Sequence, residues 1–385
     1  MKILLTTDVF IKVDGVSTSV RNLYNGLTEL GHEVRIITLS DNQKSRKDKA
    51  LYYIKSASLD AVYKGIRMPL SYNNEFIKEI IDWKPDVIHS QCEVFTYQYA
   101  LKISKKTGAP IVHTYHTMYD DYVGYIIPFK RFGKWIIRKL TKLRLKKASV
   151  IVVPTHKVEN AILNYGLKNH IEVIPSGIDL DQHKEKISPR ERLEIRRYLG
   201  VLDDEVLLIN LGRIAKEKNL ENVILNFSNA SKTYDKLKLI IVGDGPDKSR
   251  LEELCSSLGI RDKVIFTGMV DRSEVHLYYQ LGDVFVSASN SETQGLTYVE
   301  AMANSLPLLC KKDECLDGVI IDGKNGYFFD KEQDFINNLE KLLDKTNRHK
   351  LGKNSLEMST QYDKKQFGSA LEKIYIKQIK NSNAS

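Results

Sequence analysis

The chain has 385 residues, of which 42% are hydrophobic and 28% are charged, and its net charge is +9. This length and composition suit two folded domains, and the lack of any apolar run of about 18 residues excludes a membrane-spanning helix. Asp8 interrupts the first apolar run and no small-residue cleavage site follows it, which argues against a signal peptide. The four cysteines show no metal-binding spacing, which indicates reduced thiols in a cytoplasmic protein.

The excess positive charge lies entirely in the first half of the chain. Residues 1–180 contain 27 Lys and Arg against 17 Asp and Glu, whereas the remainder contains 31 against 32. Such asymmetry indicates that the first half meets an anionic surface, either a membrane or a nucleic acid.

Short apolar segments alternate with amphipathic ones along the chain. Strands are predicted at residues 2–7, 34–39, 86–90, 110–115 and 150–154, with helices at 17–30 and 74–83 between them. After a polar stretch at 177–197, where Ser188 and Pro189 mark a helix start, further strands are predicted at 206–212, 237–243, 263–268, 284–289 and 306–310. Apolar runs without alternation are typical of parallel strands covered on both faces.

This rhythm predicts an α/β protein with two Rossmann-like doubly wound domains that face each other across a cleft. The predicted domains are residues 1–180 and 181–362, and an amphipathic helix in residues 363–385 is expected to pack back on the first domain. Ligands bind at the carboxyl ends of such sheets, so the cleft is the expected active site.

The first motif follows the first strand. Asp14, Gly15 and Val16 form a loop, and a helix is predicted to begin near Ser17. Gly15 would let the backbone approach a ligand closely, and the helix N-terminus would favour a phosphate. A tight turn with a capping residue explains the same pattern.

Two motifs of the second half also follow strands. Arg213 and Lys218 lie between a strand and a helix, where two cations could hold a diphosphate; a solvated charged loop is the alternative. Gly243 begins the turn Gly-Asp-Gly-Pro, which is not a dinucleotide fingerprint. This turn is expected either to contact a ligand or to be a plain strand-to-helix turn.

A third motif pairs two glutamates, Glu292 and Glu300, with seven residues between them. The loop ends in Gly295, and a helix begins near Leu296 and Thr297, which would present free N–H groups to a sugar diphosphate. One carboxylate could hold sugar hydroxyls and the other a ribose. One capping and one surface glutamate would be the alternative.

Together these stretches resemble the retaining glycosyltransferases of family 4, which have the two-Rossmann GT-B architecture. The resemblance rests on GRIAKEKN, VGDGP, FTG and E-x7-E before AMA, and on TTDVF, DGVSTSVRNL and PDVIHSQ in the first half. It implies that Arg213 and Lys218 contact the donor diphosphate. It likewise implies that Glu292 holds the transferred sugar, Glu300 holds the ribose and Gly15 lies by the phosphates.

The resemblance extends to a finer level at two places. Many members read E-G-F-G where this chain reads Glu292-Thr293-Gln294-Gly295, a variant that looks like the subgroup making glucosyl-diacylglycerols. The segment HTYHTMYDDY also looks like that of this subgroup. His113 is expected to be a core residue, and His116 lies where the family places a histidine beside the donor sugar. The acceptor side is expected at Asp120, Asp121 and Tyr122.

Residues 128–148 contain nine Lys or Arg, and no acidic residue lies between Asp121 and Glu159. An apolar stripe recurs at helical spacing, formed by Phe129, Phe132, Ile136, Leu140 and Leu143. Such a helix can lie in a membrane interface, although packing of the stripe on the sheet is the alternative. Membrane contact is expected from Lys130, Arg131, Lys134, Trp135, Arg138 and Lys142.

We therefore expect a retaining glycosyltransferase that moves a hexose, in first place glucose, from a UDP-sugar to a membrane lipid such as diacylglycerol or glucosyl-diacylglycerol. The enzyme would act at the inner face of the cell membrane, without nucleic acid, cofactor or metal, since the Asp179-x-Asp181 pair suits a domain hinge better than a metal site. A polyprenyl-linked oligosaccharide or a protein as acceptor, and a non-catalytic sugar-nucleotide-binding subunit, are the alternatives.

Overall fold

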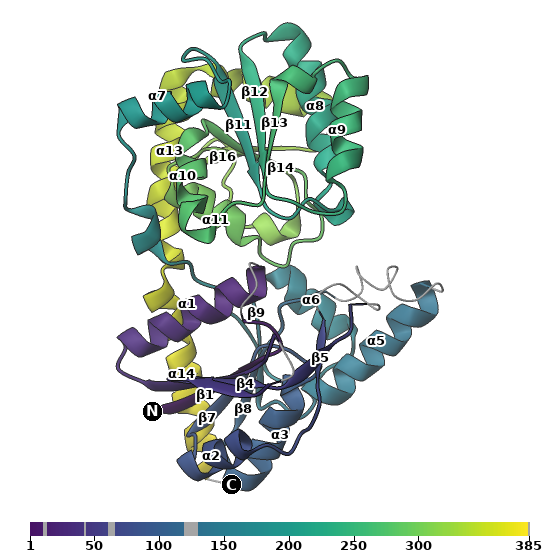
Figure 1. Cartoon of the computed structure of the whole chain (residues 1–385), viewed down its shortest axis with the longest axis vertical. Helices are drawn as coiled ribbons and strands as arrows, with labels where there is room; N and C mark the ends of the chain where they lie inside the picture. Colours follow the sequence, from purple (N-terminus) through teal and green to yellow (C-terminus); the bar gives the residue numbers. More distant parts are fainter. Residues whose placement is uncertain (11–13, 42–43, 61–65, 119–129, 384–385) are drawn as a thin grey trace. The chain divides into compact units, whose positions relative to one another are not determined.

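The computed structural model describes residues 1–10, 14–41, 44–60, 66–118 and 130–383 (Figure 1). The chain forms two compact units. Unit 1 comprises Met1–Ile178 and Tyr362–Ser385, and unit 2 comprises Asp179–Gln361. The last helix of the chain therefore belongs to the unit that contains the first strand.

Unit 1 contains an eight-stranded sheet in the order β10-β9-β8-β7-β1-β2-β4-β3. Its pairs are parallel except for β3, which runs antiparallel to β4 at the edge. The strands are β1 (Lys2–Thr7), β2 (Glu33–Leu39), β3 (Arg46–Asp48), β4 (Leu51–Ile54), β7 (Val87–Ser90), β8 (Ile111–Thr114), β9 (Val150–Val153) and β10 (Ile171–Val173), with a separate hairpin of β5 (Ser56–Ser58) and β6 (Arg67–Pro69).

Helices cover both faces of this sheet, because its strands are apolar on both sides. The helices α1 (Gly15–Glu29) and α14 (Lys364–Asn383) bury one face, and α2 (Glu75–Trp83) and α3 (Thr96–Thr107) bury the other. The end of α5 (Lys130–Leu145) and α6 (His156–Asn164) pack on β9 on the side of α3. Direct backbone contact joins α1 to α14, since a Cβ at Gly26 would lie 2.2 Å from the Lys364 carbonyl oxygen.

Unit 2 contains a six-stranded, wholly parallel sheet in the order β13-β12-β11-β14-β15-β16. The strands are β11 (Val206–Leu211), β12 (Leu237–Val242), β13 (Val264–Gly268), β14 (Val284–Ser287), β15 (Leu308–Lys311) and β16 (Gly326–Phe329). The helices are α7 (Pro189–Tyr198), α8 (Leu220–Thr233), α9 (Lys248–Ser257), α10 (Val275–Leu281), α11 (Leu296–Ala303), α12 (Glu332–Leu343) and α13 (Lys345–Ser359).

Unit 2 has the strand order of a Rossmann sheet. In such a sheet the strands that follow the first strand are added on one side of it, and the later strands are added on its other side. The order therefore reverses between β11 and β14. Unit 1 has the corresponding reversal between β1 and β7. In open α/β sheets ligands bind outside the carboxyl ends of the strands at such a reversal point, so a ligand is expected to bind at the loops after these four strands.

Candidate functional site

The reversal point of unit 2 brings Lys218 and Glu292 together. Lys218 ends a 3-10 turn after β11, and Glu292 lies in the loop after β14. The Lys218 Nζ and a Glu292 carboxylate oxygen are 2.6 Å apart, with side-chain exposures of 30% and 14%. Seventy-four residues of sequence separate the two, so the ion pair exists only because β11 and β14 are neighbours.

Hydrogen bonds hold these two loops to each other. The Asn219 side chain donates to the Ala288 carbonyl oxygen at 3.1 Å, and the Ser291 hydroxyl donates to the Glu217 carbonyl oxygen at 3.1 Å. Asn219 has a left-handed backbone (φ 52°), which turns the chain from Lys218 into α8. Arg213 lies in the same loop with an exposed side chain.

The turn after β12 packs against this loop backbone to backbone. A Cβ at Gly243 would lie 2.0 Å from the Gly212 carbonyl oxygen, and one at Gly245 would lie 2.1 Å from the Ile214 carbonyl oxygen. Gly243 also has a φ of +136°, which side chains rarely adopt. Glycine is thus required at Gly243 by packing, whatever contact this residue makes with a ligand.

Gly295 caps the N-terminus of α11 in a left-handed conformation (φ +75°). The buried Tyr298 ring fills the space beside it, 2.4 Å from where a Cβ would stand, and the Tyr298 hydroxyl lies 2.8 Å from the Ser287 hydroxyl of β14. Leu296 and Thr297, in the first turn, are half-buried. The first turn of α11 is therefore anchored to the strand that leads into it.

Glu300 lies one turn further into α11. The Tyr279 hydroxyl of α10 donates to its carboxylate at 3.0 Å. Burial raises the pKa of Glu300, and the Tyr279 hydrogen bond and the Arg272 charge partly oppose this rise. Tyr279 is a partner that the sequence analysis did not identify, because nothing in the sequence links α10 to α11.

In unit 1, the loop after β1 leads into α1 with an aspartate cap. The Asp14 carboxylate accepts a hydrogen bond from the Ser17 N–H at 2.8 Å, and the helix begins at Gly15 rather than Ser17. Within the described chain, a Cβ at Gly15 would meet no atom within 4 Å, and Val16 is half-buried. Packing of the described residues thus gives no reason for a glycine at Gly15, in contrast to Gly243.

His116 follows β8 and contacts the end of β7. Its Nε2 lies 2.7 Å from the Gln91 Oε1, and burial lowers the pKa of His116 to about 4. His113 is fully buried, with its Nε2 3.2 Å from a Glu93 carboxylate oxygen. The sequence analysis named both histidines but neither Gln91 nor Glu93. Asp120, Asp121 and Tyr122 lie outside the described residues.

The helix α5 exposes its apolar stripe. Phe132, Trp135, Leu140 and Leu143 are 50–63% exposed, and Ile136 is half-buried. The helix instead packs inward through Gly133, Thr141 and Leu145. The alternative in which the stripe packs on the sheet is therefore wrong for Phe132, Leu140 and Leu143. Phe129 and the side chain of Lys130 lie outside what the structure describes.

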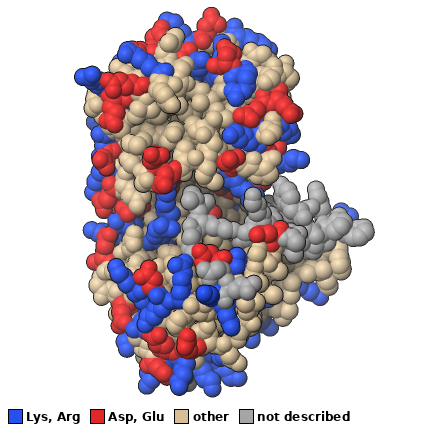
Figure 2. All heavy atoms as spheres, viewed as in Figure 1, with Lys and Arg blue, Asp and Glu red and all other residues tan. Residues whose placement is uncertain are grey.

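The basic residues of α5 flank this stripe. Arg131, Arg138 and Lys142 are exposed and Lys134 is half-buried, and Lys139 Nζ lies 4.0 Å from the centre of the Trp135 ring. On the face of the molecule that Figure 2 shows, Lys and Arg lie beside Asp and Glu in both units.

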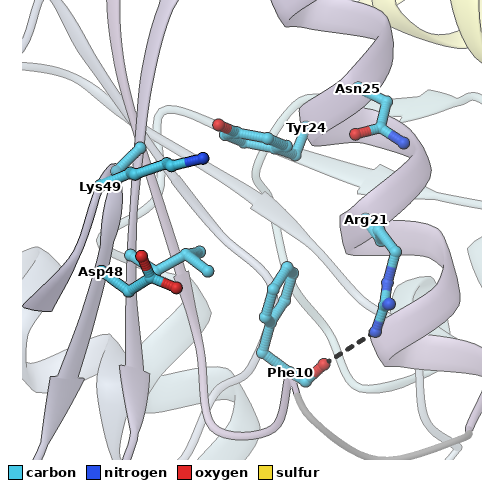
Figure 3. Close-up of a pocket in the computed structure, with 8 residues that line it drawn as sticks. Phe10, Arg21, Tyr24, Asn25, Asp48 and Lys49 are labelled. Atoms are coloured by element: carbon cyan, nitrogen blue, oxygen red, sulfur yellow. Dashed lines mark hydrogen bonds between the residues drawn. The ribbon is translucent and has the colours of Figure 1, made fainter. Parts of the chain in front are cut away.

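A separate cavity of about 250 Å³ lies in unit 1 between α1 and the β3–β4 turn. Figure 3 shows Arg21 and Tyr24 on α1, with Phe10, Asp48 and Lys49 on the other segments that line it. The Arg21 side chain donates to the Phe10 carbonyl oxygen at 3.2 Å. None of the predicted site residues lines this cavity.

Among the described residues, no group of three or more His, Cys, Asp or Glu is arranged to hold a metal ion, and no helix is long and apolar enough to cross a membrane. The Asp179 carboxylate accepts a hydrogen bond from the Asp181 N–H at 3.3 Å, and an Asp181 oxygen lies 2.7 Å from Lys184 Nζ.

Comparison with known proteins identifies the family. A model described as Glycosyltransferase Family 4 matches residues 13–182, and one described as Glycosyl transferases group 1 matches residues 191–358. Two α-monoglucosyldiacylglycerol synthases are each 34% identical over the whole chain. They come from Streptococcus pneumoniae, with 87% of the relative covered, and from Acholeplasma laidlawii, with 98% covered. The chain belongs to glycosyltransferase family 4.

Solved structures confirm the fold of this family 4 enzyme. Anabaena HepE, crystallised with UDP-glucose, superimposes with a TM-score of 0.75 at 16% identity over 97% of this chain and 99% of HepE. Sucrose-phosphate synthase from Thermosynechococcus elongatus gives 0.76 at 18% identity over 98% of both chains. These structures confirm the predicted α/β fold class with two Rossmann-like domains. The assignment as a retaining glycosyltransferase is confirmed by the family models and by the two 34% identical synthases.

Proposed function

We propose that this family 4 enzyme transfers glucose from UDP-glucose to a membrane lipid, either diacylglycerol or glucosyl-diacylglycerol. The observation that carries this proposal is the 34% identity, over the whole chain, to two α-monoglucosyldiacylglycerol synthases. The ETQG variant in the loop after β14 and the exposed basic face of α5 agree with it.

The donor would bind at the reversal point of unit 2. Arg213, Lys218 and the N-terminus of α11 would neutralise the diphosphate, because two cations and a helix N-terminus favour anions. Glu292 would hold the transferred sugar and Glu300 the ribose. The backbone of the remaining predicted donor residues would approach the nucleotide at Gly15, Val16, Gly243, Gly295, Leu296 and Thr297.

The chemistry requires no protein nucleophile in this proposal. The bond between sugar C1 and the diphosphate oxygen breaks, the acceptor oxygen bonds to C1 from the same face, and its proton passes to the leaving phosphate. The protein contributes positioning and charge stabilisation. His116, neutral because of its low pKa, would lie beside the sugar without carrying charge. Since Arg213 and Lys218 supply the neutralising charge, we propose that no metal is needed.

The acceptor lipid would reach the enzyme from an anionic membrane surface, at the inner face of the cell membrane. A helix with exposed aromatic residues and flanking cations can lie in the interface, where each cation contributes about 1 kcal/mol near an anionic surface. Contact would be made by Lys130, Arg131, Lys134, Trp135, Arg138 and Lys142. Asp120, Asp121 and Tyr122 are proposed for the acceptor side.

The test is a transfer assay with a panel of UDP-sugars and of vesicles that contain diacylglycerol, glucosyl-diacylglycerol or a polyprenyl-linked sugar. Mass spectrometry would detect the product. We expect one added hexose on a glycerolipid with UDP-glucose as donor. Transfer only to the polyprenyl acceptor or to a protein would refute the lipid assignment. Failure to consume any donor would favour a non-catalytic subunit.

A further inference from the structure

Two polar residues, Gln91 and His116, meet beyond the ends of β7 and β8. These strands are parallel neighbours, with Ser90 opposite His113, so the residues that follow them meet at one edge of the sheet. Gln91 follows β7 directly and is 2% exposed. Its amide oxygen lies 2.7 Å from His116 Nε2, across 25 residues of sequence.

Three histidines lie close together in this region, and their environments differ. The ring nitrogens of His89 are 2.6 Å from the Tyr375 hydroxyl and 2.7 Å from the Thr114 hydroxyl, and the ring is fully buried. His113 is fully buried beside Glu93. His116 is partly exposed, so of these three it is the one whose ring a ligand can reach.

The loop that bears Gln91 is fixed in place. The Gln91 N–H donates to the Thr6 carbonyl oxygen of β1 at 2.8 Å. Further along the loop, the Arg144 guanidinium of α5 donates to the Glu93 and Val94 carbonyl oxygens at 2.5 and 2.8 Å. A side chain on a loop held at both ends can orient another side chain, because its own backbone does not move with the ligand.

One half of the Gln91 amide has no partner among the described residues. The Gln91 Nε2 is buried, and neither of its two N–H groups donates a hydrogen bond to a described residue. A buried donor left unpaired costs about 1–3 kcal/mol, so a ligand oxygen that paired with it would bind more favourably. Such an oxygen would lie next to the His116 ring, because the oxygen and the nitrogen of the Gln91 amide belong to one planar group.

We propose that Gln91 is a positioning residue that holds His116 as the neutral tautomer with its proton on Nε2. The His116 Nδ1 is then an acceptor for a substrate hydroxyl, and the free Gln91 amide is a donor to an oxygen of the same substrate. This inference deepens the proposed function, because it rests on a substrate rich in hydroxyl groups. The hydroxyl belongs either to the donor hexose or to the glycerol of the acceptor.

The tautomer can be tested without measuring activity. Nitrogen NMR of the full-length protein labelled in histidine, assigned by comparison with His116→Ala, reports which ring nitrogen carries the proton. We expect protonated Nε2 in the wild type and a mixture of tautomers in Gln91→Leu. A proton on Nδ1 in the wild type would mean that the Gln91 amide donates to His116 instead, which overturns the proposal.

Kinetics test the role in the reaction. We expect Gln91→Leu to lower kcat/KM about 10-fold, the equivalent of one hydrogen bond, with an unchanged melting temperature. Gln98→Leu, on α3 in the same unit, is the matched control and should behave as the wild type. Normal kcat/KM in Gln91→Leu would overturn the proposal, even if the wild type transfers hexose to lipid as proposed.

A second variant, Gln91→Glu, distinguishes a role of Gln91 in orienting His116 from a role in packing alone. In Gln91→Glu a carboxylate faces Nε2, which favours the imidazolium and raises the pKa of His116. The charged and titratable neighbours Glu93, His113 and His89 stay the same. Activity should then fall as pH decreases from 8 to 5, whereas the wild type should show no such loss from His116. Identical pH profiles for the two proteins would contradict the proposal.

The source of the hydroxyl follows from the two substrates. If it belongs to the donor hexose, Gln91→Leu should slow the hydrolysis of UDP-glucose by water, measured without acceptor. If it belongs to the acceptor, donor hydrolysis should be normal and only the KM for lipid should rise. The absence of both effects would reject the proposal.

Discussion

At the scale of single residues, the pair formed by Lys218 and Glu292 would serve two ligand groups in the proposed function. The two side chains neutralise each other at 2.6 Å. A partly exposed pair of this kind contributes little to stability, so its removal should not unfold unit 2. A diphosphate would compete with Glu292 for the Lys218 charge, which leaves the Glu292 carboxylate available for sugar hydroxyls.

We therefore expect Arg213→Ala and Lys218→Ala each to lower turnover at least about 100-fold, since one charged donor to the transition state is worth about 3 kcal/mol. Steady-state rates with UDP-glucose measure this, and circular dichroism checks folding. Lys216→Ala is the matched control, because Lys216 is an exposed cation of the same loop. Near-normal rates in both Arg213→Ala and Lys218→Ala would remove their diphosphate role.

Glu300 should make donor binding depend on pH. Burial raises its pKa, so the carboxylate becomes protonated at a higher pH than an ordinary glutamate. An ionised carboxylate accepts hydrogen bonds from ribose hydroxyls, so UDP affinity should be highest above this pKa and fall as pH decreases through it. Glu300→Gln should bind UDP about 10- to 100-fold more weakly and lack this component.

Calorimetric titration with UDP between pH 4.5 and 8 measures the effect. The UDP phosphates ionise in the same way with both proteins, so their contribution cancels in the difference in UDP affinity between wild type and Glu300→Gln. Glu340→Gln, an exposed position on α12, should match the wild type. Parallel affinity curves for wild type and Glu300→Gln would show that this carboxylate does not bind the ribose.

At the scale of elements, apolar composition decided what could be predicted. The buried strands β1, β2, β7, β8 and β9 were expected from their apolar runs. The edge strand β3 was missed because its sequence is Arg-Lys-Asp and its pairing with β4 alone makes it a strand. The strands β10 and β16 were missed as well, since β10 has only three residues with a glutamate at its centre and β16 begins with a glycine.

The site shows the same limit. Arg213, Lys218, Glu292 and Glu300 were predicted because they stand in motifs after strands. Gln91 and Tyr279 were not predicted, because each contacts its partner across 25 or 21 residues of the chain. Local sequence patterns predict which residues follow the strands. Contacts between neighbouring loops can be predicted only when the strand order is known.

Two glycines of α1 separate packing from ligand approach. Gly26→Ala should destabilise unit 1 by about 1–3 kcal/mol, because its Cβ would lie 2.2 Å from the α14 backbone at Lys364. Gly15→Ala should leave stability unchanged, since its Cβ would meet no described atom within 4 Å, yet weaken donor binding. Urea unfolding and UDP titration on both variants measure the two effects. Equal UDP affinity in Gly15→Ala and wild type would argue against the donor role of Gly15.

At the scale of the whole molecule, the charge divides between the halves of the sequence. Residues 1–180 carry all of the excess positive charge, and the other residues are nearly neutral. Within the first half, α5 combines cations with 50–63% exposed Phe132, Trp135, Leu140 and Leu143. Exposed apolar side chains in water cost free energy, so their grouping on a basic helix is typical of a surface that meets lipid.

We expect the protein to bind vesicles that contain anionic lipid and largely to ignore neutral ones. Reversal of Lys134, Arg138, Lys142 and Lys146 to glutamate should abolish binding in a vesicle sedimentation assay. The same variant should lose activity on membrane-embedded acceptor while its UDP affinity stays normal, because the proposed donor residues lie mainly in unit 2. Binding of the wild type should weaken as salt increases, since the Debye length is about 8 Å at physiological ionic strength.

Two further variants decide whether this effect belongs to α5. Reversal of four exposed lysines of unit 2, Lys312, Lys345, Lys350 and Lys353, changes the net charge by the same amount and should leave vesicle binding nearly intact. Phe132→Ser combined with Leu143→Ser keeps every cation but removes two exposed apolar groups, so binding should persist at low salt and weaken at high salt. If the α5 reversal variant binds anionic vesicles as tightly as the wild type, α5 does not contact the membrane, and the lipid acceptor loses its structural support.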